Sequence, residues 1–257
     1  MKENIPKLEF SVAPLNETFQ LIHHFLNPSK KRNWDWSSRI YEGYSKLKSK
    51  LDGVKEIKKR KEIEHNFFEE VFKKEKNELE RKRDYFQKEW DKINNKIMLA
   101  LSEIVEQKWD EKDKKVYGRV SLNTICPRYI KVRTFDLFYR FNDKDMIRVA
   151  IHELSHFIYF DKWKKVFPKT KEKEFDNPHL IWHLSEMVPK IILNDKRIQK
   201  IFKYKFTSYN VYENFKLNGK PLLLYLQEFY DNREDFEDFL KKSWKFVQKY
   251  EKEIKAI

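Results

Sequence analysis

The most constraining feature of the chain is an uncharged run around two histidines, Val149–Ile158 (VAIHELSHFI). Apart from Glu153 and the two histidines, every residue in this run is uncharged, whereas 37% of the whole chain is charged. The run therefore predicts a buried helix. If residues 145–160 are helical, the four-residue spacing places His152 and His156 on one face, one turn apart, where each can give a ring nitrogen to the same metal ion.

Glu153 follows the first histidine directly, so its carboxylate is offset around the predicted helix. From there it can take a proton from a metal-bound water without joining the coordination shell, which makes it the candidate general base. The alternative is an ordinary buried helix with two core histidines and a paired glutamate. Three polar side chains in such a helix would be costly to remove from water, which favours a metal site.

With these residues in place, the segment resembles the active-site helix of the zincin metallopeptidases. Their pattern has a small or β-branched residue three before the first histidine, uncharged residues between the histidines and an apolar residue two after the second. The chain has Val149, Leu154, Ser155 and Ile158 at these positions. The resemblance covers about residues 115–195. It implies a Zn²⁺ cofactor and hydrolysis of a peptide or protein substrate.

A catalytic zinc needs a further protein ligand besides two imidazoles, because it usually has three protein ligands and one water. A second helix is predicted to begin at Asn177, which can cap it, with Pro178 in its first turn. In such a helix His179, His183 and Glu186 lie on one stripe, so all three are candidate ligands.

The zincin resemblance favours Glu186 as the third ligand. In the gluzincin branch, a glutamate on a second helix some tens of residues past the motif holds the metal, and Glu186 stands thirty residues after His156. The implied site is thus His152, His156 and Glu186 around zinc, with Glu153 as the general base.

Two other functions remain open. With His179 as third ligand, the site would resemble the Spartan-like proteases that act on DNA-associated proteins. With His179 or His183 in addition to Glu186, the metal would have a closed shell and a structural role in a helical interaction protein.

The fold class predicted is α+β and mostly helical. Only 4 glycines and 8 prolines occur among 257 residues, which favours long helices. Apolar residues at helical spacing fill residues 52–109, with a bend expected at Lys73–Asn77 to give an antiparallel pair and a projecting arm as the alternative. Segments rich in β-branched and aromatic residues between 115 and 140 predict a small sheet.

Two domains are expected. Residues 1–112 would form a helical N-terminal region with a long helix or helical hairpin. Residues 113–257 would form a zincin-like core, with a small mixed sheet, the metal-binding helix, a second helix that carries the third ligand, and further helices at the C-terminus.

A cytoplasmic location is expected, because no run approaches the roughly 20 apolar residues of a membrane span and Met1–Lys7 lacks the apolar core of a secretion signal. The single Cys126 allows no internal disulfide, which fits a reducing compartment. The net charge of +14 is mostly lysine interleaved with acids, as on solvated helix faces. Nucleic acid is therefore an alternative partner, and a peptide or protein substrate is the expected one.

Overall fold

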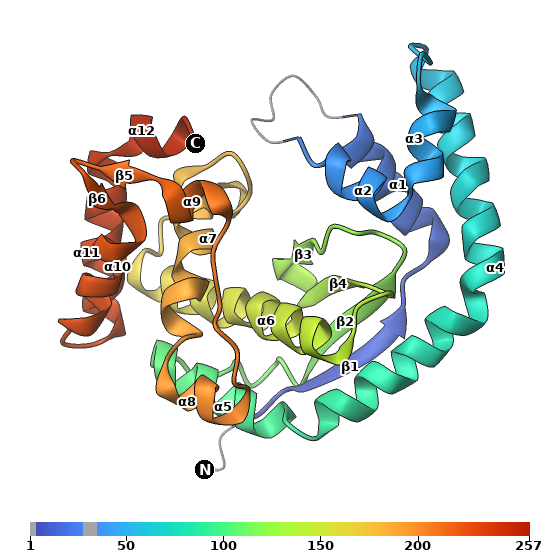
Figure 1. The fold of residues 1–257 in the computed structure, drawn as a ribbon. Helices are drawn as coiled ribbons and strands as arrows, with labels where there is room; N and C mark the ends of the chain where they lie inside the picture. Colours follow the sequence, from blue (N-terminus) through green and yellow to red (C-terminus); the bar gives the residue numbers. More distant parts are fainter. Residues whose placement is uncertain (1–3, 28–34) are drawn as a thin grey trace. The chain divides into compact units, whose positions relative to one another are not determined.

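The structure is a computed structural model that describes residues 4–27 and 35–257. The first three residues of the stretch Met1–Lys7 therefore lie outside the described residues. The chain forms two compact units (Figure 1). We call Lys7–Lys92 with Lys115–Ala150 the sheet unit, and Met1–Pro6 with Ile93–Lys114 and Ile151–Ile257 the helical unit.

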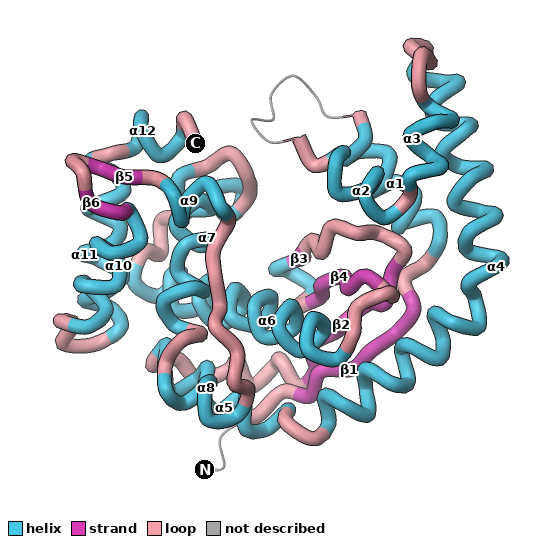
Figure 2. The backbone as a smooth tube through the Cα atoms, viewed as in Figure 1, coloured by secondary structure: helices cyan, strands magenta, loops and turns pink. Residues whose placement is uncertain are grey.

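The sheet unit contains a four-stranded mixed sheet in the order β1-β2-β4-β3 (Figure 2). Its strands are β1 (Lys7–Val12), β2 (Lys115–Ser121), β3 (Arg128–Tyr129) and β4 (Thr134–Phe138). β2 is parallel to both β1 and β4, whereas the short edge strand β3 is antiparallel to β4. The small sheet predicted between residues 115 and 140 is confirmed, with one further strand from the N-terminus.

That N-terminal strand decides how the chain divides. β1 pairs with β2 along its whole length, from Lys7 with Lys115 to Val12 with Val120. Residues more than a hundred positions apart are thereby joined in one unit. The compact units consequently do not follow the expected division between residues 112 and 113.

The long predicted helix is a single helix of 35 residues, α4 (Ile57–Asp91), followed after a short break by α5 (Asn94–Val105). The bend expected at Lys73–Asn77 was wrong. No glycine or proline interrupts α4, and the buried Phe68 and Leu79 are 11 residues apart, which keeps them on one face after three turns.

The expected alternative, a projecting arm, was also wrong. Although α4 is about 52 Å long at 1.5 Å per residue, it packs on β1 and β2 and on two shorter helices. Figure 1 shows it curving around the sheet unit, as long helices do when they follow a core. The other helices of this unit are α1 (Leu15–Leu26), α2 (Ser37–Gly43) and α3 (Ser45–Leu51).

The helical unit is built around α7 (Leu180–Ile192), in which every residue except Lys190 is buried. Three C-terminal helices pack on α7: α10, α11 and α12. Besides α5 and α7, the unit contains most of α6 (Asp143–Val166). It also contains α8 (Lys196–Ile201), α9 (Asn210–Asn214), α10 (Leu222–Asp231), α11 (Phe236–Lys249) and α12 (Glu251–Lys255). A two-stranded hairpin, β5 (Lys216–Leu217) and β6 (Lys220–Pro221), precedes α10.

The mostly helical α+β class is therefore confirmed, whereas the zincin-like character of the core stays a prediction. Within residues 4–27 and 35–257, no helix combines the length and the apolar character that crossing a membrane requires. The cytoplasmic location stays a prediction as well.

The continuity of α4 can be tested by stability measurements. Leu79 is 1% exposed, so Leu79→Ala should lower the free energy of unfolding by about 2–5 kcal/mol in a urea titration. The exposed Asn77, two residues earlier, serves as control, and Asn77→Ala should change it by less than about 0.5 kcal/mol. Similar small changes for both variants would mean that α4 is not packed beyond its middle.

Candidate metal centre

The helix that carries the histidine motif forms as predicted. Asn142 Oδ1 accepts the backbone N–H of Asp145 at 2.9 Å, which satisfies a donor of the first turn of α6. The helix continues through the motif to Val166. The apolar residues Ile151, Leu154 and Phe157 are fully buried, so the prediction of a buried helix is confirmed.

The second helix begins later than predicted. α7 starts at Leu180 with His179 as its N-cap, so the expected cap at Asn177 was wrong. The reason is local, because the N–H of His179 donates to the carbonyl of Asp176 at 3.0 Å in a turn that precedes the helix. At its other end α7 continues past Pro189 to Ile192, so Glu186 lies in an unbroken helix.

Three side chains of the helical unit converge. His152 Nε2 and His156 Nε2 on α6 are 3.0 Å apart. Glu186 Oε2 on α7 lies 3.6 Å from His152 Nε2 and 3.8 Å from His156 Nε2. Ligand atoms at 2.0–2.2 Å from a tetrahedral zinc stand about 3.3–3.6 Å from one another. The three atoms therefore suit one ion bound by two imidazoles and a carboxylate.

The group is almost entirely buried. Only 1% of the His156 side chain and 2% of the Glu186 side chain are exposed, whereas 23% of His152 is exposed. Phe160 stacks on the His156 ring at 6.2 Å. Solvent therefore reaches the three ligand atoms on the His152 side, and the apolar surroundings strengthen any charge interaction inside.

Backbone contacts hold both helices in place around these ligands. The Ser155 hydroxyl donates to the carbonyl of His152 at 2.6 Å. From a neighbouring loop, the Ser208 hydroxyl donates to the carbonyl of Glu186 at 3.0 Å. Each serine fixes the turn that carries a candidate ligand, which limits how far the ligand atoms can move apart.

Glu153 is 6% exposed and lies beside the group without belonging to it. One residue along a helix is a rotation of about 100°, so Glu153 leaves α6 on a different side from His152 and His156. This is the position expected of a base that acts on a metal-bound water rather than on the metal.

The remaining candidate ligands, His179 and His183, are outside the group. Among the described residues, the group that can hold a metal ion consists of His152, His156 and Glu186. His179 is half-buried at the N-cap of α7. His183 is buried and its Nδ1 lies 2.8 Å from the Tyr212 hydroxyl on α9.

The pair of His183 and Tyr212 was not predicted from the sequence. Burial lowers the pKa of His183 to about 4, with a smaller effect of Lys255 in the same direction and an opposing effect of Glu186. Burial and the charge of Glu186 raise the pKa of Tyr212. At neutral pH the pair is thus a neutral imidazole and a protonated phenol, within the electrostatic influence of Glu186.

Tyr212 differs from Tyr225 and Tyr230, the two tyrosines of α10. The Tyr225 hydroxyl donates to the carbonyl of Leu217 at 3.2 Å, and the Tyr230 hydroxyl donates to Asp195 at 3.1 Å. Both hold surrounding structure together. The signal that separates Tyr212 from them is its tertiary contact with α7, which no spacing in the sequence reveals.

Comparisons with known proteins found no match, either to a protein-family model, to a curated protein or to a solved structure.

The ligand set can be tested by metal analysis. The purified protein should carry about one zinc per chain, and His156→Ala and Glu186→Ala should each lose most of it because one of three converging donors is removed. His179→Ala is the control, since His179 lies outside the group, and it should keep the zinc. Chelator titration of the three variants gives the comparison. A loss in His179→Ala as large as in Glu186→Ala would contradict the assignment.

Proposed function

We propose that this chain is a zinc-dependent metallopeptidase of gluzincin type. The observation that carries the proposal is the convergence of His152, His156 and Glu186 on one point, with Glu153 next to it on the same helix. Two imidazole nitrogens and one carboxylate oxygen are a donor set found in catalytic zinc sites, which keep a further position for water or substrate.

Zinc in this place would polarise a scissile carbonyl and acidify a water. His152, His156 and Glu186 hold the ion in this scheme. Glu153 takes the proton from the water and passes it to the leaving amine, which is the usual work of a general acid and base.

Tyr212 is the residue that we assign to stabilise negative charge on the reacting carbonyl oxygen. Its phenol stays protonated, because burial and Glu186 raise its pKa, so it retains a proton to donate. His183 is neutral at neutral pH, and with its proton on Nδ1 it donates to the Tyr212 oxygen at 2.8 Å, which leaves the phenol O–H for the reacting oxygen. This pair leaves a neutral donor near a site whose other groups are acceptors.

The two other functions considered from the sequence have less support. A Spartan-like protease would use His179, which lies outside the ligand group. A structural metal would need a fourth protein donor from His179 or His183, and both lie outside the ligand group. A site with three protein ligands favours catalysis over a structural role.

The decisive substitution is Glu153→Gln. The amide has nearly the same shape as the carboxylate and lies outside the ligand group, so the variant should keep its zinc and its fold. Because it cannot accept the water proton, hydrolysis should fall on the order of 10²- to 10⁴-fold. The assay is cleavage of an unbiased peptide mixture, with products read by mass spectrometry.

Glu103→Gln is a matched control, because it makes the same chemical change at an exposed position of α5. It should leave cleavage unchanged. Equal cleavage by wild type and Glu153→Gln would remove Glu153 as the base. No cleavage by wild type, with zinc bound by four protein ligands, would favour the structural metal.

A further inference from the structure

A second charged feature lies in the sheet unit. α3 and the first turns of α4 form a helical hairpin, which we call the basic hairpin and define as residues 46–62 (Figure 1). It contains eight basic and three acidic residues, a net charge of +5. Residues 69–92, which run along the later part of α4 to its C-cap Lys92, contain eight of each, a net charge of zero.

The two parts of α4 also differ in how their charges are used. In the neutral part, several basic side chains pair with an acid of the same helix: Lys73 with Glu69 at 3.0 Å, Arg81 with Glu78 at 2.6 Å and Arg83 with Glu80 at 3.0 Å. The basic hairpin has seven exposed lysines: 46, 48, 50, 55, 58, 59 and 61. None of these seven forms an ion pair with any residue that the structure describes. A helix face exposed to solvent accounts for the balanced charges of the neutral part. It does not account for the excess of exposed lysines in the basic hairpin.

The position of these charges is also unfavourable for α4 itself. The first turn of α4 carries no acidic residue and has Lys58 and Lys59 instead. Positive charges near a helix N-terminus oppose the helix dipole, at about 0.3–1 kcal/mol each. These lysines destabilise the start of α4 and pair with no acid in the described part of the chain. We therefore expect them to bind an anion outside the protein.

The scaffold beneath the lysines is fixed by the other polar residues of the hairpin. Arg60 donates to Asn27 at 2.9 Å and to the carbonyl of Val54 at 3.2 Å, which ties the turn between α3 and α4 to α1. Just past the hairpin on α4, Glu64 is fully buried and lies 2.5 Å from His23 Nδ1 on α1. These inward contacts hold the backbone from which the exposed lysines extend.

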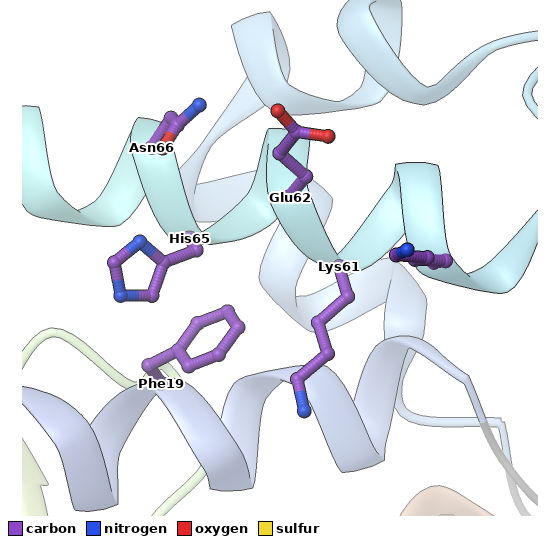
Figure 3. A pocket seen from close by; sticks show the side chains of 6 residues that line it. Phe19, Lys61, Glu62, His65 and Asn66 are labelled. Carbon is purple, nitrogen blue, oxygen red and sulfur yellow. The ribbon is translucent and has the colours of Figure 1, made fainter.

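One side of the hairpin is concave. A pocket of about 280 Å³ between α1 and α4 is lined by Phe19, Lys58, Lys61, Glu62, His65 and Asn66. Figure 3 shows the Lys61 side chain extending toward α1, and His65 beside the ring of Phe19. Lys58, Lys61 and Asn66 offer hydrogen-bond donors to a group that enters this pocket.

We propose that the basic hairpin binds the phosphate backbone of a nucleic acid, without regard to base sequence. Unpaired lysines that release counterions from phosphates supply this kind of binding. Lys58 and Lys61 face the pocket, whereas Lys55 lies in the connection before α4 and Lys59 is rotated by about 100° around the helix from Lys58. The sugar-phosphate backbone of a nucleic acid can bend around the hairpin and reach lysines on several of its sides. A flat membrane surface would contact the lysines of one side only. This proposal stands independently of the metal site.

The test is binding of a fluorescent DNA duplex of about 20 base pairs by the whole protein, measured by anisotropy at several salt concentrations. In the hairpin variant, Lys55, Lys58, Lys59 and Lys61 become glutamine. The variant should bind on the order of tenfold more weakly or worse, and the slope of log K against log salt should shrink by roughly 0.9 for each lost phosphate contact.

The matched control replaces Lys73, Lys74, Lys76 and Lys88, which are exposed in the neutral part of α4, with glutamine. Like the hairpin variant, this control loses four positive charges. It should bind the DNA duplex nearly as tightly as wild type. A second variant, Lys46, Lys48 and Lys50 to glutamine, leaves α4 unchanged and should also weaken binding. Equal weakening by hairpin and control variants would overturn the proposal, as would binding to phosphatidylserine vesicles with none to DNA.

Discussion

The candidate site depends on one physical constraint, which is that two imidazoles and a carboxylate converge inside an almost dry interior. His156 and Glu186 are each no more than 2% exposed, and burying such groups is costly unless they are compensated. A divalent cation compensates all three at once, because each supplies one donor atom and the cation balances the carboxylate. The rest of the helical unit serves to bring α6 and α7 together.

α7 meets this demand because it is buried on all sides. A helix that is apolar around its whole circumference is a core helix, and C-terminal helices pack on α7 from several directions. Glu186 and His183 are the two titratable residues among the buried residues of α7. They are three residues apart, on one side of the helix. The pair of His183 and Tyr212 thus extends the polar site from the ligands into α9.

Local patterns predicted the parts of the structure that depend on local chemistry. The spacing of His152 and His156 and the uncharged run around them were sufficient for α6. β1 could not be found in this way, because it is defined by parallel pairing with a strand more than a hundred residues later. Tyr212 was likewise beyond the sequence, since its partner is set by packing. The predicted bend in α4 failed because a polar stretch of good helix formers continues a helix as well as apolar residues do.

The central claim is that the zinc has three protein ligands and one open position. X-ray absorption spectroscopy of the zinc-loaded protein tests it most directly, because it reports the number and kind of atoms around the metal. The account predicts two imidazole nitrogens and one carboxylate at about 2.0–2.2 Å, with a light oxygen of water completing the shell. A shell with three imidazoles, or with four protein donors and no water, would contradict it.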